Sequence, residues 1–326
     1  MKLLHSVVMF LFFCTQTGCT AENPQTDISQ VPKSKIYLAD PFILRYNDTY
    51  YAYGTHASDG IEVYSSKDLQ DWKKFSSLAL SKEDSYGNKW FWAPEVYYNK
   101  ENQTFYMYYS AEEHICVATS KSPLGPFKQA VQKPMRTEKS IDSSLFIDDD
   151  GTPYLFFVRF TNGNVIWVAQ LEPDLMTIRE ATLTKCIEAT EDWELQLGKV
   201  VEGPSVFKSN GTYYLLYSAN DYQSQDYGVG YATSFSPMGT WSKSVDNPIL
   251  QKPSMKLVGT GHGAMFLDKA GKRKYVFHSH FSSTAIHPRY LSITDMLVDN
   301  NGKVTMSNSK IITPSFETSS QWYVEK

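Results

Sequence analysis

The chain has 326 residues, of which 42% are apolar and 14% aromatic, and its formal net charge is −4. That length is enough for a large hydrophobic core in one or two domains. A small negative charge without a basic run lacks the electrostatic footprint of a nucleic-acid-binding protein, so no nucleic-acid partner is expected. The 22 tyrosines suit a β-rich core in which most of the rings are buried.

Residues 1–19 predict an export signal. A positive start is followed by an apolar segment from Leu3 to Phe13 and a small-residue processing site, Thr17-Gly18-Cys19. The apolar segment is too short to be a permanent transmembrane helix. A cysteine directly after Gly18 resembles a bacterial lipoprotein box, with Cys19 as the lipid anchor. This predicts an exported cell-envelope lipoprotein, in the periplasm or on the outer membrane surface, with plain secretion as the alternative.

The polar residues 20–34 predict a tether between this anchor and a folded domain. Two cysteines, Cys116 and Cys186, remain beyond the signal. Cys116 alternates with apolar residues in a strand pattern, which predicts a buried free thiol, and whether the two cysteines pair is left open.

The stretch from Asp40 to Thr55 predicts a β-hairpin. An apolar run leads to a polar turn at Asn47-Asp48-Thr49, and an aromatic strand follows. Four later stretches repeat this pattern, with turn-forming residues at matching offsets and a further strand pattern after each hairpin. They span residues 93–111, 142–158, 203–220 and 262–280.

A repeat of about 50–60 residues that holds three or four strands is typical of a β-propeller. One small sheet cannot bury both of its faces, whereas five sheets around an axis bury each against its neighbours. We therefore predict an all-β, five-bladed β-propeller over residues 35–326, which we expect to be a monomer. The run from Lys303 to Pro314 is expected to supply the last strands. No amphipathic helix pattern occurs, which argues against a parallel α/β fold.

The opening residue of each repeat is expected to lie at one mouth of the propeller axis, where the innermost strands begin. We call these five the mouth residues: Asp40, Ala93, Asp142, Gly203 and His262. Two are aspartates, and Glu202 immediately precedes the fourth. Carboxyl groups gathered in one funnel repel one another, so at least one should have a raised pKa. A proton donor beside an ionised base is what glycosidic cleavage requires.

Five motifs resemble those of glycoside hydrolase family 43, the five-bladed propeller enzymes that act on arabinose- and xylose-containing glycans. They are LADPFILRYNDTYYAYGT, FWAPEVYY, SIDSSLFIDDDGTPYLFF, VEGPSVFKSNGTYYLLYS and GTGHGAMF. The resemblance implies that Asp40 is the general base, that Glu202 is the general acid, and that Asp142 orients the acid and tunes its pKa. It also implies inversion at the anomeric carbon, with the acid and base carboxyls roughly 6.5–9.5 Å apart.

The same resemblance implies a histidine near the axis, His262, often associated with a calcium ion. Because calcium prefers oxygen ligands, water would fill most of its shell, and a hydrogen-bonded histidine without metal is the alternative. Trp92 and Phe91 are predicted to form a sugar platform, with a packing role as the alternative. Arg289, in His-Pro-Arg-Tyr, resembles an arginine that contacts substrate, with a surface arginine as the alternative. His56 is predicted to border the pocket.

The sequence therefore predicts an inverting, exo-acting glycosidase that releases terminal α-L-arabinofuranosyl or β-xylosyl residues from plant-type oligo- or polysaccharides. An endo-arabinanase and a galactofuranosidase or galactosidase are alternatives on the same scaffold. A non-catalytic carbohydrate-binding propeller is a third, although it has no need of three converging acids. Related propeller families that retain configuration open with an Asn-Asp-Pro-Asn type motif, and Asp40-Pro41 lacks those asparagines.

Overall fold

The computed structural model describes residues 33–254 and 256–318, and their regular structure is almost entirely β. The five hairpins expected from the repeats are all present, as the first two strands of five sheets. The pairs are β2 (Ala39–Tyr46) with β3 (Thr49–Thr55), β7 (Trp92–Asn99) with β8 (Thr104–Ala111), β10 (Ser140–Ile147) with β11 (Pro153–Phe160), β14 (Val201–Ser209) with β15 (Thr212–Ala219), and β18 (Gly261–Leu267) with β19 (Arg273–Ser279). Left-handed backbone at turn positions such as Asn47, Asn210 and Gly211 explains the residue types found there.

A third strand continues every sheet, as the sequence patterns predict. These strands are β4 (Gly60–Ser66), β9 (His114–Ser120), β12 (Asn164–Gln170), β16 (Gly228–Ser234) and β20 (Tyr290–Val298). Fourth strands follow in four sheets, namely β5 (Asp71–Lys74), β13 (Thr184–Ile187), β17 (Ser242–Lys243) and β21 (Val304–Met306), whereas the sheet of β7–β9 has three strands. An additional strand of two residues, β6 (Leu80–Ser81), pairs with β4.

Helical structure in the described ranges is confined to three single turns of 3₁₀ helix. They are η2 (Lys82–Asp84), η3 (Glu180–Thr182) and η4 (Asp192–Glu194). The expectation that amphipathic helices are absent is therefore met in this part of the chain. No helix among the described residues has the length and apolar character needed to cross a membrane.

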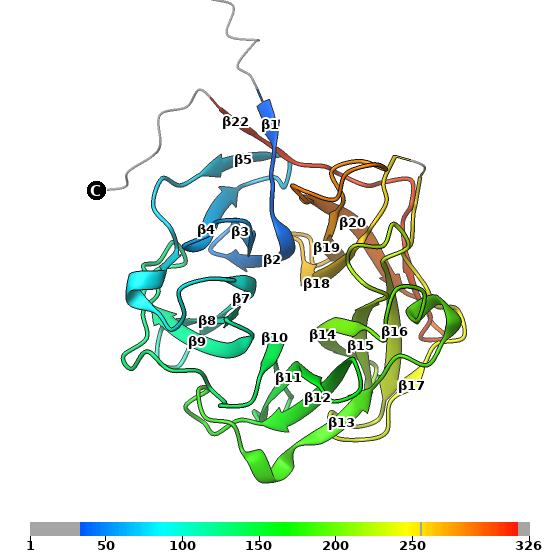
Figure 1. Ribbon diagram of the computed structural model, residues 1–326, viewed down its shortest axis with the longest axis horizontal. Coiled ribbons are helices and arrows are strands. Elements are labelled where there is room, and N and C mark those ends of the chain that lie inside the picture. Colours follow the sequence, from blue (N-terminus) through cyan, green and yellow to red (C-terminus); the bar gives the residue numbers. More distant parts are fainter. Residues whose placement is uncertain (1–32, 255, 319–326) are drawn as a thin grey trace, which may run out of the picture. The chain divides into compact units, whose positions relative to one another are not determined.

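The sheets are arranged around a central axis with their first strands innermost (Figure 1). These first strands contact one another in a closed ring, β2 with β7, β7 with β10, β10 with β14, β14 with β18, and β18 with β2. Apolar clusters fill the space between neighbouring sheets. Tyr108 packs with Phe157 across one such junction, and Leu216 packs with Phe277 across another. The predicted all-β, propeller-like arrangement is confirmed.

The first sheet contains strands from both ends of the described chain. β1 (Lys33–Lys35) pairs with β22 (Ser315–Glu317), which runs parallel to β5. β1 begins two residues before the predicted domain start at residue 35, inside the stretch predicted to be a tether. The predicted signal at residues 1–19, with its anchor Cys19, lies outside the described residues, and the assignment of 35–326 to one domain stays a prediction.

Two further expectations concern the C-terminal run and the cysteines. β21 pairs with β20, and Ile312 bridges to Ile293, so the run from Lys303 to Pro314 supplies late strands as predicted. Cys116 is buried and Cys186 partly buried, and both are free thiols. Burial raises the pKa of the Cys116 thiol to about 12, which makes it unreactive at neutral pH.

Candidate active site

Each inner strand carries a β-bulge where it opens, and the bulge positions the mouth residue. The register shifts at this point in all five strands, for example between Ala39 and Phe42 in β2. The mouth residues all have left-handed φ angles, which are 49° at Asp40, 44° at Ala93, 57° at Asp142, 56° at Gly203 and 42° at His262. Such backbone costs about 1–3 kcal/mol at a non-glycine residue. Bulges commonly re-aim side chains beside active sites, and here they turn the mouth residues toward the axis.

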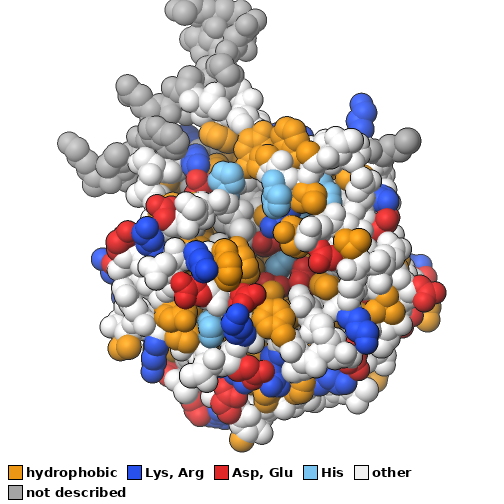
Figure 2. Space-filling model, in the orientation of Figure 1, with side chains coloured by type: hydrophobic (Ala, Val, Ile, Leu, Met, Phe, Trp, Pro, Cys, Tyr) orange, Lys and Arg blue, Asp and Glu red, His pale blue; other side chains and the backbone are white. Residues whose placement is uncertain are grey.

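Two cavities meet at these residues. A small one of about 10 Å³ lies on the axis and is lined by all five mouth residues and by Glu95. A larger pocket of about 740 Å³ shares Asp40, Asp142 and His262 with it and is also lined by Glu202. That volume is typical of a small-molecule site. Figure 2 shows a hollow at the centre of this face, with acidic and histidine side chains in its depth.

Asp40 is held as an ionised carboxylate. Its Oδ1 accepts a hydrogen bond from Arg289 Nη1 at 3.0 Å, and its Oδ2 accepts one from Thr55 Oγ1 at 2.7 Å. Burial by itself would raise the pKa of Asp40, but the Arg289 guanidinium, with contributions from the His262 and His278 rings, holds this pKa well below its ordinary value of 3.8. Asp40 is therefore ready to accept a proton at neutral pH.

Glu202 has the opposite electrostatic environment. Its carboxyl is buried, and no cation among the described residues pairs with it; Tyr227 Oη donates to Oε1 and Asn164 Nδ2 donates to Oε2, each at 2.8 Å. Burial raises the pKa of Glu202 to about 7 against the opposing effect of these two hydrogen bonds, and the negative charge of Asp40 adds to the rise. A large fraction of Glu202 is therefore protonated near neutral pH.

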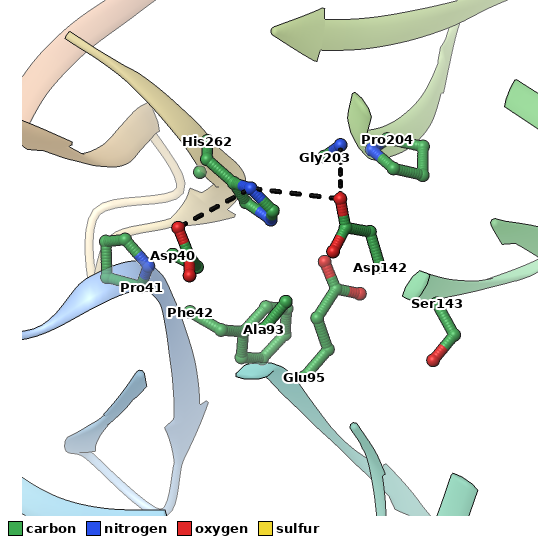
Figure 3. A pocket seen from close by; sticks show the side chains of 11 residues that line it. Asp40, Pro41, Phe42, Ala93, Glu95, Asp142, Ser143, Gly203, Pro204 and His262 are labelled. Carbon is green, nitrogen blue, oxygen red and sulfur yellow. Dashed lines mark hydrogen bonds and ion pairs between the residues drawn. The ribbon is translucent and has the colours of Figure 1, made fainter. Parts of the chain in front are cut away.

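Asp142 and Asp40 lie on either side of the axial His262 ring (Figure 3). Asp142 Oδ2 accepts a hydrogen bond from the backbone N–H of Gly203 at 3.2 Å and lies 3.9 Å from His262 Nδ1. Burial, followed by the charges of Glu202 and Asp40, raises the pKa of Asp142 well above its ordinary value. The sequence-based expectation of at least one raised pKa among clustered carboxyls is met by this residue and by Glu202.

The axial cavity tests the expectation of a calcium ion near His262. The His262 ring lies 3.5 Å from Asp40 Oδ1 through Nδ1, and burial lowers its pKa, which favours a neutral imidazole. Within the described ranges, no group of three or more His, Cys, Asp or Glu side chains is arranged to hold a metal. A cavity of about 10 Å³ has room for about one water. The residues therefore do not fit a calcium ion held directly by the protein, and a water-mediated ion stays a prediction.

The remaining predicted residues divide into three that line the large pocket and one that does not. Trp92, His56 and Arg289 line it, and the Trp92 ring stacks on Trp90 with centroids 5.5 Å apart. Arg289 is not a surface arginine, because its ion pair with Asp40 is almost wholly buried.

Phe91 is only 1% exposed and stacks on Tyr109 in the hydrophobic core. The prediction that Phe91 forms a sugar platform therefore has to be corrected in favour of a packing role. In an extended strand neighbouring side chains point to opposite faces, so Phe91 and Trp92 cannot both face the pocket.

Four residues that contact the two acids are absent from the sequence-based predictions. Asn164 and Tyr227 hold Glu202, and Thr55 and His278 contact Asp40. Asn164 and Tyr227 belong to third strands or the loops before them, which do not contain a mouth residue. Thr55 closes the first predicted hairpin, so its place opposite Ala39, the residue before the mouth residue, could have been inferred from the hairpin register.

The site combines an ionised carboxylate and a protonated carboxyl in one pocket on a propeller-like frame, the arrangement required for hydrolysis by acid–base catalysis. Residues 30–304 match the family model described as glycosyl hydrolases family 43. The chain therefore belongs to glycoside hydrolase family 43.

Individual relatives agree with this assignment. A β-D-galactofuranosidase from Aspergillus niger is 27% identical over 295 residues, covering 83% of each chain. An arabinoxylan arabinofuranohydrolase from Bacillus subtilis is 26% identical over 63% of this chain, which spans about half (48%) of that relative. A crystal structure described as an endo-1,4-β-xylanase from Bacteroides thetaiotaomicron is 55% identical, with a TM-score of 0.85, and covers 88% of this chain and 99% of that one.

Proposed function

We propose that this glycoside hydrolase is an inverting, exo-acting enzyme on a five-bladed propeller that releases terminal α-L-arabinofuranosyl or β-xylosyl residues from plant-type glycans. Asp40 is the general base, Glu202 the general acid, and Asp142 the group that orients Glu202 and tunes its pKa. The observation that carries the proposal is the opposite displacement of two pKa values in one pocket, lowered at Asp40 and raised to about 7 at Glu202.

The reaction follows from these protonation states. Asp40 accepts a proton from a water molecule, whose oxygen attacks the anomeric carbon. Glu202 donates its proton to the glycosidic oxygen as the bond from that oxygen to the anomeric carbon breaks. Asp40 ends protonated and Glu202 ionised, and one proton moves between them through solvent to restore the starting state.

Substrate class is supported by the relatives and by the pocket. A named arabinofuranohydrolase and a named xylanase among the relatives favour pentose-containing glycans. A pocket of about 740 Å³ suits one or two sugar rings and so supports exo action. Two alternative activities are each favoured by one relative. The galactofuranosidase matched over 83% of both chains favours galactofuranoside cleavage. The relative at 55% identity, described as an endo-1,4-β-xylanase, favours endo action on β-1,4-xylan.

The test is sugar release from para-nitrophenyl arabinofuranoside, xyloside and galactofuranoside. Glu202→Gln and Asp40→Asn should each lose about 10²–10⁴-fold in kcat on the preferred natural oligosaccharide, since acid and base assistance are each of this size. Equal turnover of that natural oligosaccharide by wild type and Glu202→Gln would exclude Glu202 as the general acid. Proton NMR of the first anomer released separates inversion from retention. Product lengths from arabinan and xylan separate exo from endo action.

The cellular setting is proposed from the sequence alone. We infer export through residues 1–19, anchoring by lipid at Cys19 to a bacterial envelope membrane, and a monomeric enzyme. Globomycin-sensitive processing and labelling with a fatty acid that is lost in Cys19→Ser would test the anchor.

A further inference from the structure

Neighbouring sheets are linked by a repeated hydrogen bond at the mouth of the axis. The backbone N–H of a mouth residue donates to a side chain on the second strand of the preceding sheet. The bonds run from Ala93 to Thr55 Oγ1 at 3.0 Å, from Asp142 to Ser110 Oγ at 3.0 Å, from His262 to Ser218 Oγ at 2.7 Å, and from Asp40 to His278 Nδ1 at 3.1 Å.

The four acceptors occupy one structural position. Each acceptor lies on the second strand of its own sheet. Its cross-strand partner on the first strand is the residue immediately before the mouth residue. The pairs are Thr55 with Ala39, Ser110 with Trp92, Ser218 with Glu202, and His278 with Gly261. The third sheet has Val158 there, opposite Ile141, and valine cannot accept. The backbone N–H of Gly203, which follows this sheet in the ring, therefore has no acceptor at that position and donates instead to the side chain of Asp142.

Thr55 differs from the other acceptors because its hydroxyl also contacts a catalytic carboxyl. A threonine hydroxyl has one hydrogen to donate. The Ala93 N–H is itself a donor, so it occupies a lone pair of Oγ1 and leaves the hydrogen free to point elsewhere. That hydrogen goes to Asp40 Oδ2 at 2.7 Å, while Oδ1 faces Arg289. Each oxygen of Asp40 thus has its own donor.

We propose that Thr55 is a positioning residue for Asp40, with its hydroxyl direction set by the backbone of the neighbouring sheet. The proposal rests on the function proposed above, in which Asp40 is the base. Through Thr55 the junction between the first two sheets fixes the plane of the Asp40 carboxylate, and with it the line along which a water proton is taken.

The test compares Thr55→Val, which keeps the shape and removes the hydroxyl, with Thr55→Ser, which keeps the hydroxyl. Thr55→Val should lower kcat about 10–100-fold, since misplacing a reacting group by about 1 Å has this effect. It should also move the acid limb of the kcat/KM profile to higher pH, because a carboxylate that loses a donor holds its proton more tightly. Thr55→Ser should restore both.

Ser218→Ala is the matched control, because it removes an equivalent bond between sheets without touching Asp40. It is expected to lower the melting temperature as Thr55→Val does and to shift the acid limb less than Thr55→Val, because it reaches Asp40 only through the His262 ring. A wild-type kcat and acid limb in Thr55→Val, or a failure of serine to restore them, would overturn the proposal.

A measurement that does not depend on catalytic turnover separates the role of Thr55 from the proposed function of the enzyme. Carboxyl ¹³C shifts of labelled aspartate, with Asp40 assigned through Asp40→Asn, should show Asp40 titrating at higher pH in Thr55→Val than in wild type. If Asp40→Asn is fully active, the proposed function fails whatever Thr55 does. If Asp40→Asn is inactive and neither the shift nor the kinetics respond to Thr55→Val, only the role of Thr55 fails.

Discussion

Two neutral donors, the Tyr227 hydroxyl and the Asn164 amide, oppose the effect of burial on Glu202, the proposed general acid, whose pKa burial raises. Both stabilise the ionised form, so they keep the pKa of Glu202 near the pH at which an acid must gain and lose its proton in every cycle. Without them the carboxyl would stay protonated over a wider range but would be slower to give its proton away.

Tyr227→Phe is therefore expected to move the basic limb of the kcat/KM profile upward. In wild type that limb should lie near pH 7, where Glu202 loses its proton. Removing the hydroxyl destabilises the carboxylate, which raises the pKa of Glu202 by about one unit if the bond contributes about 1.5 kcal/mol. The control is Tyr217→Phe, which breaks a tyrosine bond to a different buried carboxylate, Glu194. A basic limb that moves down or stays in place in Tyr227→Phe would contradict this account.

How far single residues are predictable depends on whether the repeat contains them. The convergence of Asp40, Asp142 and Glu202 on one pocket is predictable because they occupy, or adjoin, the same offset in copies of one hairpin. Phe91 was misplaced, because adjacent aromatic residues do not reveal which one faces the core. Asn164 and Tyr227 lie far from any mouth residue in sequence and reach Glu202 only through the packing of the sheets.

At the scale of elements, the bulge at the start of each inner strand directs one residue of every repeat toward the same cavity on the axis. Gly203 occupies the bulge that carries Glu202, with φ of 56°, and a β-carbon at this position would lie 3.0 Å from the His262 ring. Backbone conformation and a close ring contact thus both favour glycine. In the turn of the same hairpin Gly211 has φ of 78° with nothing within 4 Å of the equivalent point.

Gly203→Ala and Gly211→Ala form a matched pair that separates these two effects. Each should lower the free energy of unfolding by about 1–2 kcal/mol, the cost of left-handed backbone for an L-residue. Only Gly203→Ala should also lower kcat/KM, by at least about tenfold, because the His262 ring and the bulge must move apart. Urea unfolding and steady-state kinetics on both variants provide the check. Equal kinetics in the pair would show that the contact with His262 is immaterial.

The strands were largely predictable, and their special connections were not. Turn residues such as Asn47-Asp48 and Asn210-Gly211 mark each hairpin locally, so its two strands follow from the sequence. The bulges leave a weaker mark, since aspartate, histidine and glycine tolerate left-handed backbone in many contexts and Ala93 is not a residue that favours it. The parallel pairing of β22 with β5 joins segments more than 240 residues apart, and no local pattern encodes it.

At the scale of the whole molecule, the acids whose pKa values are raised in the folded state, Glu202 and Asp142, destabilise the fold at neutral pH. An acid whose folded pKa is raised binds its proton more tightly when folded. The resulting destabilisation is absent below the unfolded pKa, grows between the two pKa values and is complete above the folded value. Glu202 rises from 4.5 to about 7. At about 1.4 kcal/mol per unit, it should lower the free energy of unfolding by about 2 kcal/mol between pH 5 and pH 8.

Glu202→Gln removes that ionisation and keeps nearly the same shape. The variant should be inactive on natural substrates yet more stable than wild type at pH 8, and its free energy of unfolding should fall by about 2 kcal/mol less between pH 5 and pH 8. Urea unfolding at the two pH values measures this, with Glu101→Gln, at an exposed turn carboxyl, as the control. If wild type and Glu202→Gln lose the same stability over this range, burial does not raise the pKa of Glu202, and the argument for its role as the acid loses its physical basis.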